Sequence, residues 1–212
     1  MRVALRRVAL VAVVALGIVL PERGIAAASA ATETVRGFYD ALLATMRNGA
    51  TLGQRGRYTK LEPVVRQTFD VAFMTQTASG PAWASMPEAK RRELGEAFGR
   101  FIAATWADRF KTYAGQKLEV TGERQAGEAP LVETRIVKAN GEPVSINYLM
   151  RRNGEVWQVA DVYMDGTISE LAIRRSEFTV VLRDQGVDGL IRSLNGKVEA
   201  MLSMRLSGGP AR

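Results

Sequence analysis

Residues 153–178 read NGEVWQVADVYMDGTISELAIRRSEF. Asn153-Gly154 is typical of a two-residue hairpin turn, because both central positions of a type I′ turn require a positive φ. The run from Glu155 to Met164 is rich in Val, Trp and Tyr, which predicts a strand that ends at Asp165-Gly166. Val144 to Arg151 precedes the turn and is its predicted antiparallel partner. This hairpin is the part of the chain from which the rest of the fold is derived.

A turn at Asn153-Gly154 would fix the hairpin register and, with it, the side chains that share a face. The pairs expected to lie opposite each other are Arg152–Glu155, Met150–Trp157, Tyr148–Val159, Ile146–Asp161 and Val144–Tyr163. This face is almost wholly apolar, with the carboxylate of Asp161 in its middle. One side of the sheet is therefore predicted to contact either the core of the protein alone or also a bound apolar ligand.

A long helix is predicted over residues 86–113, with Ser85 and Glu88 as its capping box. Its apolar positions recur at helical spacing and include Phe98, Phe101, Ile102 and Trp106. A stripe of this kind packs on a sheet as part of the core, and some of its rings could also line a ligand cavity. Periodicity alone does not decide between these two interpretations.

The other elements complete a fold of the α+β class with a single domain. Patterns predict helices over 32–47, 61–69 and 71–77, a loop over 53–58, strands over 118–123 and 131–139, a helix after Thr167 and a last helix after Asp188. Together with the hairpin, the strands would form a four-stranded antiparallel meander. Several helices would pack around it and enclose an apolar pocket.

Residues 1–30 have the features of a secretory signal peptide. Arg2, Arg6 and Arg7 precede an apolar run from Val8 to Leu20, and Ala28-Ser29-Ala30 matches a cleavage site. We expect export to the periplasm with cleavage after Ala30; the alternative is an uncleaved N-terminal anchor. The predicted domain covers 31–206, and the tail 207–212 is predicted to be disordered.

The net charge of the chain indicates which partners it binds, and its composition excludes several kinds of catalytic and metal site. The leader holds four arginines and one glutamate, so the formal net charge falls from +7 to +4 when it is removed. A mildly basic exported protein is predicted to bind an anionic membrane surface or an acidic protein rather than nucleic acid. The sequence has no His and no Cys. This excludes disulfides, Ser-His-Asp and Cys-His nucleophiles, and His- or Cys-ligated metals; no cofactor or metal is expected.

Arg175 lies within the apolar stripe of the helix that follows the hairpin, and Asp161 lies on the apolar face of the sheet. Buried charges persist when they are paired, so we predict an ion pair between Asp161 and Arg175 that fastens the helix to the sheet. The alternative is catalytic: Asp161 acting as a general base beside Tyr148 or Tyr163.

The pattern of residues 154–162, with Asp165-Gly166, Ile168-Ser169 and Arg175-Ser176-Glu177-Phe178, resembles the signature of the MlaC (toluene-tolerance) family. The form Ser169-Glu170-Leu171-Ala172 resembles most the hopanoid-biosynthesis-associated branch, HpnM. The resemblance implies a periplasmic lipid-binding protein whose helices and sheet enclose a lipid pocket and which serves a lipid-transporting ABC system.

The function expected from the residues and the resemblance is that of a soluble, non-catalytic and monomeric periplasmic lipid carrier. Its partners would be a hopanoid or phospholipid and membrane-bound transporter components. The residues predicted to line the lipid site are Phe98, Phe101, Ile102, Trp106, Val144, Ile146, Tyr148, Met150, Trp157, Val159 and Tyr163. Two alternatives stay open at this point: a scaffolding subunit with a filled core, and an enzyme that uses Asp161 on an apolar lipid.

Overall fold

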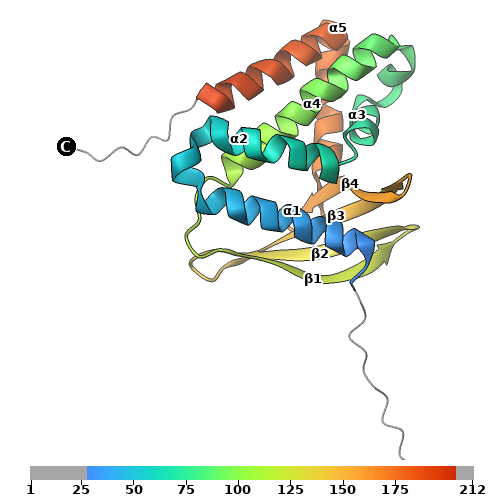
Figure 1. Cartoon of the computed structure of the whole chain (residues 1–212). Coiled ribbons are helices and arrows are strands. Elements are labelled where there is room, and N and C mark those ends of the chain that lie inside the picture. Colours follow the sequence, from blue (N-terminus) through green and yellow to red (C-terminus); the bar gives the residue numbers. More distant parts are fainter. Residues whose placement is uncertain (1–27, 204–212) are drawn as a thin grey trace, which may run out of the picture.

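The computed structural model describes residues 28–203, in which helices gather on one side of an antiparallel sheet (Figure 1). The elements in chain order are α1 (Ala30–Arg47), α2 (Gly49–Thr68), α3 (Val71–Ser79), the 3-10 helix η1 (Gly80–Ser85), α4 (Glu88–Arg109), β1 (Lys117–Ala126), β2 (Ala129–Val137), β3 (Pro143–Asn153), β4 (Val156–Met164), β5 (Ile168–Ser169) and α5 (Glu170–Ser203). The expected leader, apart from its last three residues, and the expected tail lie outside the described residues.

The sheet is a meander in the order β1-β2-β3-β4-β5, with every neighbouring pair antiparallel. The predicted α+β class and the four predicted strands are confirmed. A short fifth strand, β5, follows β4 and pairs with it. The turn between them uses Asp165 and Gly166, both at positive φ (49° and 78°). Helix α5 consequently begins at Glu170, three residues later than the predicted start at Thr167.

The turn of the β3–β4 hairpin lies one residue further along than predicted. Asn153 pairs with Val156, so the two loop residues are Gly154 and Glu155. Gly154 has a φ of 59° and no positive φ is present at Glu155, which is the pattern of a type II′ turn rather than type I′. The pairs near the turn become Arg152–Trp157 and Met150–Val159.

A β-bulge then changes which side chains share a face. After the Met150–Val159 pair the register shifts, and Leu149 lies opposite Asp161, so Ala160 is the additional residue on β4. Beyond the bulge, Tyr148 pairs with Val162 and Ile146 with Met164. All five predicted pairs are therefore wrong. The later turn moves each β4 partner along by two residues, and the inserted residue moves the β4 side chains beyond it to the opposite face.

Two further predictions about the helices are corrected. Residues 53–58, predicted to be a loop, belong to α2, which is interrupted only at Gly53 (φ 58°, ψ −173°). The capping box predicted for α4 does not form. The hydroxyl of Ser85 donates to the carbonyl of Ala82, and α4 begins after Pro87 and ends at Arg109.

Helix α2 is joined to the end of α4 by a fully buried arginine. Arg57 donates from Nε to the carbonyl oxygen of Ala107 and from Nη1 to that of Gly49, each at 3.0 Å, and from Nη2 to the side chain of Gln54. These bonds satisfy carbonyl groups at the broken start of α2 and in the last turn of α4. Arg57 thereby fixes the end of α4 that carries Arg109. Among the helices of residues 28–203, none is long and apolar enough to cross a membrane.

Candidate functional site

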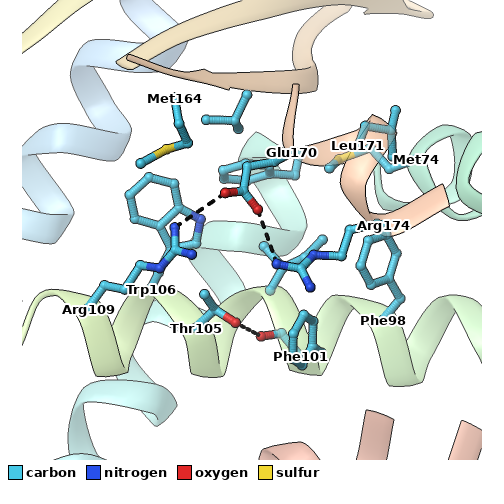
Figure 2. A pocket seen from close by; sticks show the side chains of 13 residues that line it. Met74, Phe98, Phe101, Thr105, Trp106, Arg109, Met164, Glu170, Leu171 and Arg174 are labelled. Atoms are coloured by element: carbon cyan, nitrogen blue, oxygen red, sulfur yellow. Dashed lines mark hydrogen bonds and ion pairs between the residues drawn. The ribbon is translucent and has the colours of Figure 1, made fainter. Parts of the chain in front are cut away.

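A small apolar cavity of about 60 Å³ lies where α3, α4 and the first turn of α5 meet β4 (Figure 2). The residues that line it are Phe69, Met74, Phe98, Phe101, Ile102, Thr105, Trp106, Arg109, Val162, Met164, Glu170, Leu171 and Arg174. We call this space the inner cavity. Most of its wall comes from one face of α4, whose apolar residues recur at three- and four-residue spacing.

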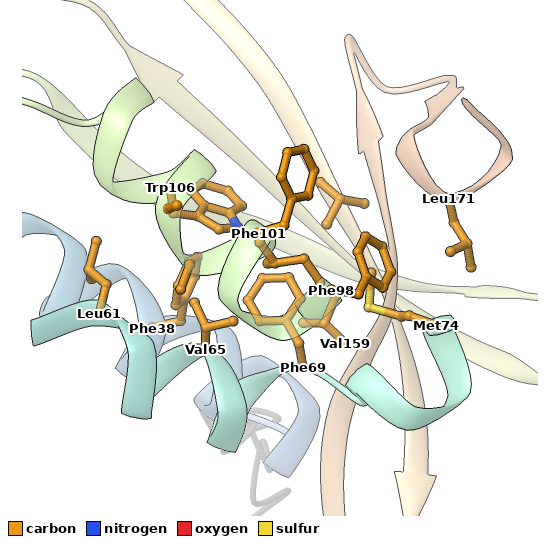
Figure 3. Packing of buried hydrophobic residues seen from close by; sticks show 14 of the residues in the cluster. Phe38, Leu61, Val65, Phe69, Met74, Phe98, Phe101, Trp106, Val159 and Leu171 are labelled. Carbon is orange, nitrogen blue, oxygen red and sulfur yellow. The ribbon is translucent and has the colours of Figure 1, made fainter. Parts of the chain in front are cut away.

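The rings of this wall pack against each other and against the core (Figure 3). Phe98 makes an edge contact with Phe178, with 5.1 Å between the ring centroids, and stacks on Phe101 at 6.4 Å. Trp106 contacts Phe38 edge-on at 4.9 Å. These contacts hold the aromatic wall in place, and Thr105 places its hydroxyl on the carbonyl of Phe101, so that it leaves no free donor toward the cavity.

Three charged side chains line one end of the inner cavity (Figure 2). Glu170, the first residue of α5, has one carboxylate oxygen 3.7 Å from a guanidinium nitrogen of Arg109 and the other 3.1 Å from one of Arg174. Arg174 also pairs with Glu177 at 2.7 Å and lies over the ring of Phe101, 5.2 Å from its centroid. The carboxylate of Glu170 thus links the end of α4 to the first turn of α5.

A second, open cleft of about 620 Å³ adjoins the inner cavity. Its lining residues are Met46, Trp106, Asp108, Arg109, Phe110, Lys111, Thr112, Gln116, Ile136, Lys138, Val144, Ile146 and Met164. We call this space the outer cleft. Trp106, Arg109 and Met164 line both spaces, so these three side chains form the partition between them.

The sizes of the two spaces determine what the arrangement can hold. An apolar cavity of about 150 Å³ accommodates a benzene molecule, so the inner cavity is too small for a lipid chain as it stands. Pockets that bind small molecules measure about 300–1,000 Å³, a range that includes the outer cleft. Movement of the half-buried Met164 would widen the passage between the two spaces.

The structure brings together six of the residues predicted for the lipid site. Phe98, Phe101, Ile102 and Trp106 line the inner cavity, and Val144 and Ile146 line the outer cleft.

The other five lie elsewhere. Tyr148, Met150 and Val159 are fully buried in the core and are absent from the lining of either space. Trp157 lines a separate groove between α1, the end of α2 and β4, and half-buried Tyr163 lies outside both linings. The hairpin face was displaced by the bulge, which puts Val162 and Met164 at the site in place of the predicted β4 residues.

Several lining residues were missed by the sequence analysis. Val162 and Met164 could be found only by locating the bulge. Arg109, Glu170 and Arg174 come from two helix ends that are far apart in the sequence and meet through tertiary packing. An available signal was the spacing of Glu170 and Arg174, since residues four apart on a helix are neighbours.

The predicted ion pair between Asp161 and Arg175 is wrong. Asp161 accepts hydrogen bonds from the backbone N–H of Val162 (2.7 Å), from the hydroxyl of Ser169 (2.5 Å) and from the backbone N–H of Leu171 (3.0 Å). Arg175 is exposed, and its guanidinium lies beside Gly80. These three hydrogen-bond donors, from β4 and the connection to α5, satisfy the carboxylate of Asp161, so it needs no cationic partner.

These contacts also bear on the catalytic interpretation of Asp161. Burial raises the pKa of its carboxyl group, and the hydrogen bonds from Ser169, Leu171 and Val162 oppose that rise. The carboxylate is directed to the start of α5, and the residue is not part of the lining of the inner cavity. Within residues 28–203 the acidic side chains form no cluster of three or more that could hold a metal ion.

Comparison with known proteins gives three findings. A family model described as MlaC protein matches residues 36–196. The intermembrane phospholipid transport system binding protein MlaC of Haemophilus influenzae is 27% identical over 120 residues, which are 54% of this chain and 56% of that protein. The chain thus spans about half the length of this curated relative.

The third finding is a solved structure. The phospholipid-binding protein from Ralstonia solanacearum, determined in complex with a phospholipid, is 24% identical with a TM-score of 0.68, and the match covers 81% of this chain and 98% of that one. At this level of identity the likeness shows a shared fold.

Proposed function

The chain belongs to the MlaC family, and on this premise we propose that it is a periplasmic carrier that holds lipid between its sheet and helix α4. The cargo is a phospholipid or a hopanoid, and the protein moves it between membranes or between membrane-bound transport complexes. Binding is non-catalytic. Support for the periplasmic setting comes from the signal-peptide features of residues 1–30 and from the relative whose name refers to intermembrane phospholipid transport.

The observation that carries the proposal is the pair of adjoining spaces separated by Trp106, Arg109 and Met164. Met164 is an unbranched, half-buried side chain that can change rotamer without a change in the backbone, whereas Trp106 is held by its contacts with Phe38 and Phe110. The outer cleft is the larger of the two spaces, and the inner cavity lies against buried core residues such as Phe98 and Leu171. A hydrocarbon chain would therefore enter through the cleft and extend past the partition.

The energetics of such binding need no covalent step. Each CH₂ group removed from water contributes about 0.8 kcal/mol, so a chain that buries roughly ten methylenes gains roughly 8 kcal/mol before the cost of opening the partition. A bound lipid is released when a partner offers an equivalent apolar site. This reversible exchange is what a carrier requires.

The hopanoid alternative for the cargo is supported by a short pattern. Ser169-Glu170-Leu171-Ala172 resembles the hopanoid-associated branch of the family, and Glu170 and Leu171 line the inner cavity. The identity of the lipid recovered from the protein distinguishes a hopanoid from a phospholipid.

Native mass spectrometry of the purified, exported protein tests the proposal. We expect a lipid adduct on the unaltered protein. Ile102→Trp, which fills the inner cavity, should reduce that adduct, while Val180→Trp on the exposed side of α5 should keep it. A folded protein that carries no lipid and takes none from vesicles would instead support the scaffold alternative, and chemical turnover of the bound lipid would support an enzyme.

A further inference from the structure

We propose that Arg109 binds the phosphate of a lipid headgroup at the junction of the inner cavity and the outer cleft. Without lipid, the carboxylate of Glu170 occupies the position that this phosphate would take beside Arg109. The inference rests on the proposed function and names the chemical class of the cargo. It starts from the position of Arg109, which lines both spaces at the end of α4.

The contacts of Glu170 have the geometry of a bridging anion. Its two carboxylate oxygens go to different guanidinium groups, one to Arg109 and one to Arg174. A phosphodiester also presents two charged oxygens on one centre, and guanidinium groups bind such oxygens with charge-assisted hydrogen bonds. A headgroup phosphate can therefore make the same two contacts that Glu170 makes.

Arg109 is the less satisfied of the two arginines. Arg174 has a second carboxylate, Glu177, at 2.7 Å and the ring of Phe101 beneath it. For Arg109, the ion pairs found among residues 28–203 provide one carboxylate oxygen, and its distance of 3.7 Å is too long for a hydrogen bond. Since its side chain is 47% exposed, Arg109 can accept an incoming anion without first breaking a strong contact.

The charge of the outer cleft matches an anionic headgroup. Of its four charged lining residues, Arg109, Lys111 and Lys138 are basic and Asp108 is acidic. Lys111 pairs with Asp108 at 2.9 Å and Lys138 with Glu142 at 3.1 Å, so Arg109 has the weakest carboxylate contact of the three cations. Its remaining wall is largely apolar, including Trp106, Phe110, Ile136, Val144 and Ile146. A basic rim over an apolar wall is complementary to a molecule with hydrocarbon chains and a negatively charged head.

A competition experiment tests the inference on the purified full chain. Vesicles supply dioleoylphosphatidylglycerol and dioleoylglycerol in equal amounts, so that the two lipids differ only in the phosphate-bearing headgroup. Native mass spectrometry then gives the ratio of the two adducts. We expect a preference of about tenfold for phosphatidylglycerol, the effect of one charge-assisted contact.

The variants separate the roles of the two residues. Arg109→Gln should reduce the preference to near one while dioleoylglycerol still binds. Glu170→Gln should increase the preference, because the competing carboxylate is gone. The matched controls are Arg92→Gln and Glu62→Gln, two residues of ion pairs that line neither space, and both should keep the ratio of the unaltered protein. Thermal melting confirms that every variant is folded.

The outcomes distinguish this inference from the proposed function. Equal binding of the two lipids in the unaltered protein, or a ratio that Arg109→Gln leaves unchanged, would overturn the headgroup site while leaving a lipid carrier. Binding of neither lipid would overturn the proposed function itself. A third arm uses inorganic phosphate: stabilisation by phosphate that depends on Arg109, with no preference between the lipids, would assign the site to a free anion and overturn its assignment to a headgroup.

Discussion

The carboxylate of Asp161 accepts a hydrogen bond from the backbone N–H of Leu171 at 3.0 Å, which ties strand β4 to the first turn of helix α5. The same carboxylate accepts from Val162 and from the hydroxyl of Ser169, and Ser169 in turn accepts from the N–H of Ala172. Because Leu171 and its neighbour in the first turn line the inner cavity, this acidic residue positions part of the site from outside it.

Replacement of Asp161 by alanine should destabilise the protein. The change leaves the N–H groups of Val162 and Leu171 without their acceptor in a buried region, at a cost of about 1–3 kcal/mol for each unsatisfied group. We expect the free energy of unfolding to fall by about 2–4 kcal/mol, measured by urea denaturation.

Arg175→Gln tests the ion pair between Asp161 and Arg175 that the sequence predicted. Arg175 is exposed, so its replacement should change the free energy of unfolding by less than about 0.5 kcal/mol. A loss as large as that of Asp161→Ala would mean that the two side chains do form a pair in solution.

The pH dependence of stability should report the burial of Asp161. Its folded pKa is raised above the ordinary value of 3.8. The folded state therefore holds the proton of Asp161 more tightly than the unfolded state does. This stabilises the folded state fully below the ordinary pKa of 3.8, and the stabilisation is lost as the pH rises through the raised folded pKa. The free energy of unfolding of the unaltered protein, relative to that of Asp161→Asn, should decrease over this window. A relative stability that increases with pH would contradict the raised pKa.

Arg57→Ala should destabilise the protein far more than replacement of an exposed arginine in the same helix, α2. The change removes three buried donors and leaves the carbonyl groups of Gly49 and Ala107 unpaired, so a loss of about 3–5 kcal/mol is expected in urea denaturation. Arg55→Ala, two residues away and 68% exposed in its side chain, is the control and should cost less than about 1 kcal/mol. Similar losses for both variants would refute the structural role of Arg57.

The absence of cysteine from the sequence allows a direct test of the hairpin register. The bulge places Val162 in the wall of the inner cavity and leaves Tyr163 outside that lining. In single-cysteine variants, a maleimide should modify Tyr163→Cys faster than Val162→Cys. Prior loading with lipid should slow the reaction at position 162 further and leave the reaction at position 163 unchanged. Protection of position 163 alone would contradict the bulged register and support the register predicted from the sequence.

The local patterns of the sequence predicted the meander and the wall supplied by α4. Turn signals and strand-forming residues are adjacent in the chain, so the four main strands could be placed. The helical spacing of Phe98, Phe101, Ile102 and Trp106 puts these side chains on one face, and all four line the inner cavity.

The register and the polar end of the site could not be predicted in the same way. The run Val159-Ala160-Asp161-Val162-Tyr163 has apolar residues on both faces, so its pattern does not reveal an inserted residue. The contact of Arg109 with Glu170 depends on how α4 and α5 pack, which no local pattern encodes.

Fluorescence quenching by lipid with brominated acyl chains tests the central claim most directly. One variant retains Trp106 as the single tryptophan, and another retains only Trp157, which lines the separate groove. If hydrocarbon passes the partition between the outer cleft and the inner cavity, bound brominated lipid should strongly quench Trp106 and leave Trp157 bright. Undiminished emission from Trp106 in protein shown to carry the lipid would contradict the account.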